Sequence, residues 1–460
     1  MIVIKFGGTS IQDADAMSNM IEIVKSKIPK KPIVVLSAAA GITDALIKCA
    51  RLASEDREAE ALEALEGQIV AKHYGMIQGL IHGLSEQDST IRQFSTLFSE
   101  LRNLLRGISI TGDLSKRVLD FVMSYGERMS TTLAALAMKE RNVHAQWIDS
   151  RQCILTNENF GKAEPDFEAT ALKCRDILLP VLESNAVPVM QGFIGATAKG
   201  VTSTLGRGGS DYTAAIVGAV LHADDIEIWT DVDGILTADP KIVPHARRLK
   251  VMSFQEASEL AYFGAKVLHP STLLPAVEKN IPVHIYNSRR PHVLGTLVKT
   301  NVAPTNICVK SVSYKKNITV LNISSTRMLG SYGFMKRIFD TFDAFKTSVD
   351  LVTTSEVSVS LSIDHTPDLD GLVKELSSFG IVSVESEKAI VCIVGERIKD
   401  EKGLASRIFG RLKDINIHMI SQGGSEINIT FVIDEKDIPH AVRELHDEFF
   451  ANIDGEDVFE

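Results

Sequence analysis

The segment Ile2-Val3-Ile4-Lys5-Phe6-Gly7-Gly8-Thr9-Ser10 decides the fold of the chain. Its apolar run predicts a buried strand, and the lysine and two glycines that follow predict a turn into a helix. Glycine lets backbone N–H groups approach a phosphate closely, a helix N-terminus favours negative charge, and a lysine adds a point charge. The segment therefore indicates a phosphate site, with an ordinary strand–helix turn as the alternative.

Apolar runs and helical patterns alternate after this segment, over roughly the first 290 residues. Strands are predicted at residues 2–6, 33–36, 143–148, 187–190, 226–229 and 283–286, and helices at residues 13–28, 114–141 and 211–222. Such alternation favours an α/β fold with a mostly parallel sheet that helices cover on both faces. The charged, Leu-rich stretch at residues 55–107 predicts an inserted helical pair, which we interpret as a solvated scaffold.

An internal repeat occupies the last third of the chain. The pattern Gly333-Phe334-x-x-Arg337-Ile338-Phe339 returns 70 residues later as Gly403-Leu404-x-x-Arg407-Ile408-Phe409. Ser355-Glu356-Val357 returns at the same offset as Ser425-Glu426-Ile427. Two copies of this length are too few for a solenoid. They predict a pair of small α/β sensor domains behind one larger α/β domain.

The composition is that of a globular protein with an acidic surface. Hydrophobic residues make up 45% of the 460 residues, charged residues 23%, and the formal net charge is −10. That charge disfavours nucleic acid and membranes as partners, but not an anionic substrate in a locally positive pocket. The five cysteines form no Cys-x-x-Cys pair, which indicates reduced thiols. With no signal peptide pattern and no long apolar run, we expect a cytoplasmic protein.

A glycine-rich segment, Leu205-Gly206-Arg207-Gly208-Gly209-Ser210-Asp211-Tyr212, precedes a predicted helix. A guanidinium between glycines has little to pack against and suits a bidentate grip on a carboxylate. Ser210 is predicted to cap the helix, and Asp211 lies in the first turn, where negative charge is favourable. The alternative, that both residues only cap the helix, stays open for Asp211.

Two further segments contain small residues where a ligand needs room. Ser124-Tyr125-Gly126-Glu127-Arg128 lies inside a predicted helix, and its glycine costs about 1 kcal/mol relative to alanine. That cost indicates a close backbone approach or a ligand, with Glu127 either binding an ammonium group or pairing with Arg128 at the helix surface. Leu36-Ser37-Ala38-Ala39-Ala40-Gly41-Ile42-Thr43 follows a predicted strand, which fits a ligand site or a common loop.

Two segments later in the chain suit a nucleotide. Trp229-Thr230-Asp231-Val232-Asp233-Gly234-Ile235-Leu236-Thr237-Ala238-Asp239-Pro240-Lys241 follows a predicted strand and lacks the terminal glutamate of an EF-hand calcium loop. Gly264-Ala265-Lys266-Val267-Leu268-His269-Pro270 ends a predicted helix with a lysine that either binds phosphate or is merely solvated. The sequence has no P-loop motif and no His-Arg-Asp loop, which excludes P-loop enzymes and protein kinases.

Together, six ordered motifs resemble the aspartate kinases. They are Lys-Phe-Gly-Gly-Thr-Ser from residue 5, Ser-x-Gly-Glu from 124, Gln-Gly-Phe-Ile-Gly from 191, Leu-Gly-Arg-Gly-Gly-Ser-Asp-Tyr from 205, Trp-Thr-Asp-Val-Asp-Gly from 229 and Phe-Gly-Ala-Lys-Val-Leu-His-Pro from 263. The tandem repeat resembles the paired ACT domains of the same family. The resemblance implies an amino-acid-kinase domain at residues 1–295, a first ACT domain at 316–386, and a second built from 304–315 and 387–460.

By this resemblance, the protein transfers the γ-phosphoryl group of ATP, with Mg²⁺, to the β-carboxylate of L-aspartate, at the start of lysine, threonine and methionine biosynthesis. Lys5 and Asp211 would be catalytic, with Lys5 neutralising the phosphoryl oxygens in the transition state. The substrate would contact Ser37, Thr43, Glu127, Phe193, Arg207 and Ser210. ATP would contact Lys5, Phe6, Gly7, Gly8, Thr230, Asp231, Leu236, Lys241, Lys266 and Val267, with Gly7 and Gly8 donating N–H groups to phosphate.

The first repeat is most similar to the lysine-inhibited branch of the family. Feedback inhibition by L-lysine would involve Met328, Ser331, Phe334, Met335, Ser348, Val349, Asp350, Thr354, Ser355 and Glu356. Asp350 and Glu356 would hold the ammonium groups of lysine, with two surface acids as the alternative. The ACT domains imply a homodimer or a dimer of dimers. Leu236 and Gly330 stand where the family often has an aromatic residue and a histidine.

Two alternative functions are open from the sequence. One is a kinase of the same fold for another amino acid or carboxylate, although Glu127 and Arg207 favour a substrate that carries both charges. The other is an amino acid sensor without catalytic activity, which the intact Lys5, Arg207 and Asp211 disfavour. No Ser-His or Cys-His nucleophile pair is predicted, so every candidate site suits a phosphate, a carboxylate or an ammonium group.

Overall fold

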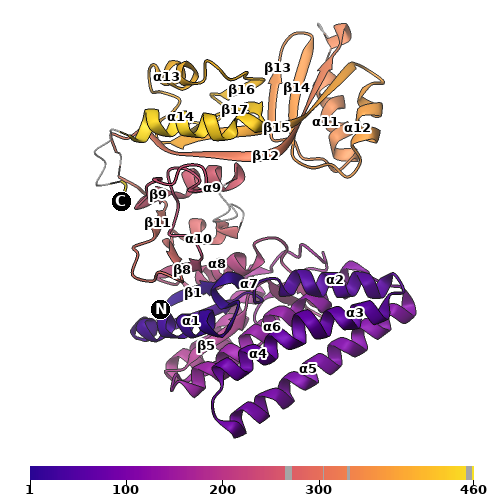
Figure 1. Cartoon of the computed structure of the whole chain (residues 1–460), viewed down its shortest axis with the longest axis vertical. Coiled ribbons are helices and arrows are strands. Elements are labelled where there is room, and N and C mark those ends of the chain that lie inside the picture. The colour runs from indigo at the N-terminus through magenta and orange to yellow at the C-terminus, as the bar shows by residue number, and fades with distance from the viewer. Residues whose placement is uncertain (265–271, 304, 329–331, 452–457) are drawn as a thin grey trace. The chain divides into compact units, whose positions relative to one another are not determined.

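The computed structural model describes residues 1–264, 272–303, 305–328, 332–451 and 458–460. The chain divides into two compact units, which are described separately (Figure 1). The first unit contains Met1–Ile235, Lys250–Phe254 and Val267–Asn301, and the second contains Leu236–Leu249, Gln255–Lys266 and Val302–Glu460. Among the described helices, none is both long enough and apolar enough to span a membrane.

An eight-stranded sheet of order β3-β5-β2-β1-β8-β10-β11-β9 forms the centre of the first unit. Its strands span Ala145–Ile148 (β3), Val187–Gln191 (β5), Pro32–Leu36 (β2), Ile2–Phe6 (β1), Asp225–Thr230 (β8), Val283–Asn287 (β10), Thr296–Lys299 (β11) and Val251–Ser253 (β9). The strands from β3 to β10 in this order are parallel, as predicted, whereas β11 pairs antiparallel with β10.

The strands at the centre of this sheet are buried on both faces. Every residue of β1, β2 and β5 is buried, as expected where helices cover both sides of a parallel sheet. One group of helices, α1 (Ala14–Lys27) and α6 (Lys116–Glu140), contacts the sheet, and so does a second group, α7 (Phe167–Glu183) and α8 (Gly209–Leu221) (Figure 1). The helices predicted at residues 13–28, 114–141 and 211–222 are thus confirmed.

The insertion is helical, as predicted. It contains α3 (Glu58–Ala64), a π-helical turn (Leu65–Val70), α4 (Ala71–Leu80) and most of α5 (Leu84–Thr111), which pack with α2 (Ile42–Ser54). Phe94, Phe98 and Leu101 are buried in one core with the sheet helices. Lys72 on α4 also donates from Nζ to the carbonyl oxygen of Ala40, at 2.6 Å. The insertion is therefore part of the main core and supports the loop after β2, so the interpretation as a solvated scaffold is wrong.

A three-stranded sheet lies in the same unit and has no counterpart in the sequence prediction. It consists of β4 (Leu155–Thr156), β6 (Ile194–Thr197) and β7 (Thr202–Thr204). These strands are two to four residues long and rich in threonine, so neither an apolar run nor alternation marks them. β7 leads directly into the segment with Arg207, and the small sheet therefore positions part of the candidate site.

A six-stranded sheet of order β13-β14-β12-β15-β17-β16 forms the centre of the second unit. Its strands span Leu351–Thr354 (β13), Ser358–Ile363 (β14), Val309–Ser324 (β12), Ile381–Gly395 (β15), Asn428–Asp434 (β17) and Met419–Gln422 (β16). The first repeat adds α11 (Phe334–Ala344) and α12 (Leu369–Leu376), and the second adds α13 (Leu404–Arg411) and α14 (Ile438–Phe450). Both repeats show the predicted order of strand, glycine turn, helix and two strands.

The two repeats share their longest strands. β12 and β15 pair antiparallel from Val309 opposite Gly395 to Ser324 opposite Ile381. The later half of β12 pairs with β14 of the first repeat, and the later half of β15 pairs with β17 of the second. The register shifts between Lys315 and Ile318, where the paired strands pass from one repeat to the other. The ACT boundaries at residues 316 and 387 stay a prediction.

Two segments from the middle of the chain pack within the second unit. The N–H of Val312 donates to the carbonyl oxygen of Thr237 at 2.8 Å, which attaches residues 236–249 to β12. Helix α9 (Phe254–Tyr262) is attached to the same strand by a buried ion pair, in which Lys310 Nζ lies 2.7 Å from Glu256 Oε1. The first compact unit is therefore less continuous than the proposed domain at residues 1–295.

Replacing Gly126 with alanine should destabilise the first unit. A Cβ atom at Gly126 would lie 2.7 Å from the Cβ of Ala38, in the loop after β2. Overpacking of this kind costs about 1–3 kcal/mol, and the gain of about 1 kcal/mol from alanine's helix propensity offsets only part of it. Urea unfolding of Gly126→Ala should show a lower midpoint than that of the wild type.

Gly107 on α5 supplies the matched control. No atom lies within 4 Å of a Cβ built there, so Gly107→Ala should raise the unfolding midpoint. Equal or higher stability of Gly126→Ala relative to Gly107→Ala would contradict the close packing of α6 on this loop.

Candidate active site

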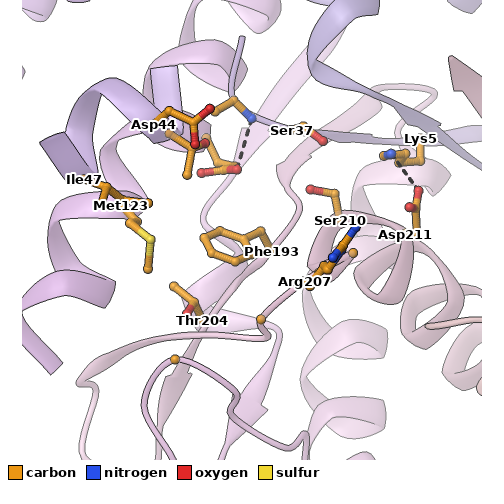
Figure 2. Close-up of a pocket in the computed structure, with 17 residues that line it drawn as sticks. Lys5, Ser37, Asp44, Ile47, Met123, Phe193, Thr204, Arg207, Ser210 and Asp211 are labelled. Carbon is orange, nitrogen blue, oxygen red and sulfur yellow. Dashed lines mark hydrogen bonds and ion pairs between the residues drawn. The ribbon is translucent and has the colours of Figure 1, made fainter. Parts of the chain in front are cut away.

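A cavity of about 650 Å³ opens in the first unit at the carboxyl ends of β1, β2 and β5 (Figure 2). β1 lies between β2 and β8, so the strand order reverses there, and such a switch point leaves a crevice in α/β sheets. The lining includes every residue that the sequence predicted as catalytic or substrate-binding: Lys5, Ser37, Thr43, Glu127, Phe193, Arg207, Ser210 and Asp211.

An ion pair joins the two predicted catalytic residues. Lys5 Nζ on β1 lies 2.6 Å from Oδ1 of Asp211, in the first turn of α8 (Figure 2). Both side chains are largely buried, with 11% and 15% of their surface exposed, so water and salt screen the pair weakly. Asp211 therefore fixes the position of the Lys5 ammonium group, and its role extends beyond the helix terminus.

The glycine-rich turn before α8 presents Arg207 at the cavity. Gly206 and Gly208 have φ angles of +79° and +71°, a region that glycine enters without strain. Arg207 between them is exposed, and its guanidinium has no hydrogen-bond or ion-pair partner in the described parts of the chain. The N-cap of α8 is Gly208, so the prediction that Ser210 caps this helix is wrong. Ser210 lies in the first turn and lines the cavity.

Glu127 on α6 is a buried acid in the cavity wall. Its Oε1 accepts a hydrogen bond from the N–H of Ala38 at 3.1 Å, and its Oε2 has no partner among the described residues. Burial raises the pKa of Glu127 to about 8. Arg128 lies near Glu100 instead, at 3.6 Å, which excludes the surface pairing of Glu127 with Arg128. The unpaired oxygen makes Glu127 suitable for binding a cationic group.

The loop from β2 to α2 carries two further predicted contacts. The N–H of Ser37 donates to the carbonyl oxygen of Phe6 at 3.2 Å, and the carbonyl oxygen of Ser37 accepts from Ser130 Oγ at 2.7 Å. Thr43 lies in the first turn of α2, whose N-cap is Gly41 with a φ of +80°. These bonds hold the loop between β1 and α6, so that Ser37 and Thr43 face the same cavity.

Phe193 follows β5 and adopts an uncommon backbone conformation. Its φ of +67° costs on the order of 1 kcal/mol for a residue with a side chain. Its N–H donates to Thr213 Oγ1 at 3.0 Å, which stabilises this conformation. A Cβ at Gly209 would lie 2.7 Å from the Phe193 ring, so the glycine-rich turn fits closely against it. The ring therefore forms a fixed wall of the cavity.

The glycines after β1 differ in what they offer to a phosphate. The N–H of Gly7 donates to the carbonyl oxygen of Trp229 at 3.0 Å, so the prediction that Gly7 donates to phosphate is wrong. Gly8 begins a short 3₁₀ helix, Gly8–Ile11, where the first N–H groups have no partner within the helix. Phe6 is fully buried and stacks on Trp229 at 6.0 Å between ring centroids, which limits it to backbone contacts with a nucleotide.

The other residues predicted for the nucleotide are divided between the parts of the chain. Thr230 and Asp231 come at the carboxyl end of β8, beside β1 in the first unit. Leu236 and Lys241 belong to the second unit. Lys266 and Val267 lie outside the described residues. The described cavity therefore includes none of these side chains, and their role stays a prediction.

Several cavity residues escaped the sequence analysis. Asp44 and Ile47 follow Thr43 on α2, and Met123 lies one turn before Glu127 on α6. Helical spacing from the predicted contacts was the signal that could have found these residues. Gly161 lies in a loop and Thr204 in β7, where no sequence pattern indicated a site.

The predicted effector residues belong to the second unit. Phe334 is buried, and Met328, Met335 and Val349 pack against the same apolar core of the first repeat. Ser348, Thr354, Ser355 and Glu356 are exposed, and Ser331 lies outside the described residues. For Glu356, the structure therefore agrees with the alternative interpretation, in which it is a surface acid.

Asp350 is not a surface acid. Only 3% of its side chain is exposed, and its Oδ1 accepts from Tyr262 at 2.7 Å and from Lys315 Nζ at 3.0 Å. Lys315 also lies 2.9 Å from Asp364 Oδ2. The carboxylate of Asp350 is therefore already paired with an ammonium group of the protein itself.

Comparison with known proteins identifies relatives along the whole chain. The model of the amino acid kinase family matches residues 1–287, and an ACT domain model matches residues 391–449. Lysine-sensitive aspartokinase 3 of Escherichia coli is 40% identical, over 98% of this chain and 99% of that protein. Chloroplastic aspartokinase 1 of Arabidopsis thaliana is 35% identical, over 98% of this chain and 80% of that protein.

Solved structures of E. coli aspartokinase III share the fold. The R-state complex with aspartate and ADP has a TM-score of 0.85 and 39% identity, covering 98% of this chain and 100% of that one. The T-state complex with lysine and aspartate has a TM-score of 0.81 and 40% identity, covering 98% and 99%. The chain therefore belongs to the amino acid kinase family, as an aspartokinase with C-terminal ACT domains.

Proposed function

We propose that this chain transfers the γ-phosphoryl group of ATP to the side-chain carboxylate of L-aspartate, giving 4-phospho-L-aspartate and ADP. The observation that carries the proposal is one cavity in which Lys5, Arg207 and Glu127 converge from three distant segments. The two cationic side chains can bind a phosphate and a carboxylate, and the acidic side chain can bind an ammonium group. A relative of the same fold binds aspartate and ADP, which supports both ligands.

The chemistry needs positioning and charge neutralisation. We assign the substrate carboxylate to Arg207 and Ser210, and its ammonium group to Glu127, with Ser37, Thr43 and Phe193 shaping the remaining wall. A side-chain carboxylate oxygen of the substrate attacks the γ-phosphorus, while the bond from that phosphorus to the bridging oxygen of ADP breaks. No proton moves, because the carboxylate is already ionised, and so no general base is required. Lys5 then stabilises the charge on the transferred oxygens, with Asp211 holding its ammonium group in place.

Mg²⁺ fits this site as a companion of the nucleotide. Among the described residues, groups of three or more potential metal ligands occur only at His245, His446 and Asp447, which do not line the cavity. Asp211 is already paired with Lys5, and Glu127 is assigned to the ammonium group of the substrate. Mg²⁺ takes most of its ligands from phosphate and water, and bound there it would neutralise phosphate charge. For ATP itself we retain Gly8, Thr230 and Asp231 in the first unit, whereas Leu236, Lys241, Lys266 and Val267 stay predictions from the family pattern.

We also propose that L-lysine inhibits the enzyme through the first ACT repeat. A relative named lysine-sensitive, and its complex with lysine, support this effector. Lys315 and Tyr262 hold Oδ1 of Asp350, and its buried Oδ2 has no partner among the described residues, so an incoming ammonium group would compete with both side chains for this carboxylate. Feedback inhibition is then an exchange of partners that shifts the protein between two states.

The first repeat has a strand edge suited to a second copy of the chain. Residues 381–385 of β15 pair with β12 on one side, and no described strand pairs with their other side. Ile381 and Val384 on this edge are 78% and 40% exposed, and exposed apolar edges invite pairing with another chain. This edge supports the proposal of a homodimer, or a dimer of dimers, formed through ACT domains.

Lys5→Ala should lower kcat sharply without unfolding the protein. Loss of one preorganised cation at the transferred group typically costs about 10²–10³-fold in kcat. ADP release, coupled to a reporter enzyme, measures the rate with aspartate and Mg-ATP. Lys25→Ala is the control, because Lys25 is a surface residue of α1 paired with Glu22. Near-wild-type kcat in Lys5→Ala would contradict its role, and a wild-type chain that released no ADP with aspartate would favour the sensor interpretation.

The Michaelis constant for aspartate should depend on pH through Glu127. Its pKa of about 8 in the free protein lies above the ordinary 4.5, so the carboxyl is protonated at neutral pH. Because the substrate ammonium needs the ionised form, KM for aspartate should fall as pH rises toward about 8 and then level off. By the same linkage, the free energy of unfolding should fall as pH rises from about 4.5 to about 8, because over that range the unfolded chain releases the proton that the folded protein keeps.

Kinetics from about pH 6 to about pH 9 check this expectation. The charged groups that face the same cavity are Lys5, Asp44, Arg207 and Asp211. Glu127→Gln should raise KM for aspartate and remove its pH dependence, whereas Glu100→Gln, outside the cavity, should retain it. The same pH dependence in Glu127→Gln would assign it to another group.

Tyr262→Phe should make the enzyme more sensitive to lysine. Loss of the hydroxyl removes one of the two partners that hold Asp350. Lysine then has one competitor fewer for this carboxylate. The half-inhibitory lysine concentration should fall by up to about tenfold, with kcat in the absence of lysine unchanged. Tyr314→Phe is the matched control, because Tyr314 donates to Asp239 at 2.7 Å and does not contact Asp350. An unchanged inhibition curve in Tyr262→Phe would refute the competition.

A further inference from the structure

A buried carboxylate on α6 lies behind the cavity wall. Asp120 is fully buried, about one turn before Met123 and two turns before Glu127, so the three side chains lie on one face of the helix. Met123 and Glu127 line the cavity, whereas Asp120 does not. Nothing in the proposed chemistry uses Asp120, although a buried carboxylate is costly unless its hydrogen bonds are made.

All three hydrogen bonds that Asp120 accepts come from segments distant in sequence. Its Oδ2 accepts from the N–H groups of Gly161 and Thr204, both at 2.9 Å. Its Oδ1 accepts from Thr204 Oγ1 at 2.8 Å. Gly161 and Thr204 both line the cavity. The carboxylate therefore joins α6 to the loop before α7 and to β7, and all three segments contribute residues to the cavity lining.

The two segments held by Asp120 also contact each other and lead to Arg207. The N–H of Ala163 donates to the carbonyl oxygen of Thr204 at 2.8 Å. A Cβ at Gly206 would lie 3.1 Å from the carbonyl oxygen of Gly161, so the glycine-rich turn lies against this loop. Since the Arg207 side chain has no described protein partner, its direction depends on the backbone on either side of it.

An aspartate suits this position for a chemical reason. Two backbone N–H groups and one hydroxyl converge on it, and a carboxylate accepts at both oxygens. Burial raises the pKa of Asp120, while the hydrogen bonds from Gly161 and Thr204 and the charge of Lys116 oppose that rise.

We propose that Asp120 is a positioning residue for the amino acid substrate: it holds the Gly161 loop and β7 so that Arg207 faces the substrate carboxylate. The proposal rests on the function proposed above, in which Arg207 binds that carboxylate. Asp120 acts through Arg207 and does not touch the reacting atoms. The residues retained for ATP in the first unit follow β1 and β8, and among the described residues none of them forms a hydrogen bond with Gly161 or Thr204.

Asp120→Ala therefore should affect the two substrates differently. The N–H groups of Gly161 and of the buried Thr204 lose their acceptor, and KM for aspartate should rise about tenfold or more, while KM for ATP stays within about twofold. Asp120→Asn is the conservative variant, because its carbonyl oxygen can accept from the N–H groups and its amide can donate to Thr204 Oγ1. It should bring KM for aspartate back to within about threefold of the wild type.

Asp166→Ala is the control for general destabilisation. Asp166 caps α7 by accepting from the N–H of Ala169 at 3.0 Å and does not line the cavity. This variant should lower the thermal midpoint and leave KM for aspartate unchanged. If Asp120→Ala likewise lowered only stability and the active fraction, with KM for aspartate unchanged, Asp120 would be merely structural and the inference would be overturned.

A double-mutant cycle with Arg207→Ala tests the route of the effect. If Asp120 acts through Arg207, Asp120→Ala should add little to the KM for aspartate once Arg207 is removed. Fully additive effects would overturn the inference. A wild-type chain that does not phosphorylate aspartate would instead overturn the proposed function itself, which keeps the two failures apart.

Discussion

The ion pair between Lys5 and Asp211 is the interaction on which the rest of the site depends. It joins the central strand of the first unit to the first turn of α8, and the glycine-rich turn with Arg207 is continuous with that helix. One contact therefore relates the two cations that line the cavity, to which we assign the phosphate and the substrate carboxylate. A lysine at this depth among apolar strands is stable only with a partner, so the strand, the helix and the catalytic charge depend on one another.

Much of this arrangement follows from the sequence, and the exceptions have physical causes. Strands such as Ile2–Phe6 are uniformly apolar because helices cover both faces of the sheet, and site residues follow their carboxyl ends at glycines. Asp120 and Thr204 leave no such signal, because hydrogen bonds between distant polar groups have no periodicity. The prediction that Gly7 donates to phosphate failed because the parallel pairing of β1 with β8 continues one residue past the end of β1. The N–H of Gly7 is used in that pairing. Which backbone N–H groups stay available for a ligand is decided only by the pairing of strands in the folded protein.

In the second unit, too, the sequence does not reveal which residues pair in the folded protein. The acidic residues of the first repeat are visible in the sequence, but the partners of Asp350 are not: Lys315 comes from β12 and Tyr262 from the end of α9. Because α9 and residues 236–249 belong to this unit, segments that the family pattern assigns to the nucleotide are attached to the sensor repeats. Under the proposed inhibition by lysine, a change of partner at Asp350 would break the hydrogen bond that Tyr262, at the end of α9, donates to it.

The sharing of β12 and β15 has a consequence for synthesis on the ribosome. Residues 309–315 emerge before the first repeat, yet they pair with the end of β15, which is translated after it. The second repeat thus encloses the first in the nascent chain and cannot complete its sheet until the last part of the protein has been made. During that interval an apolar strand is left without its partner, a state in which chaperone binding protects a chain from aggregation.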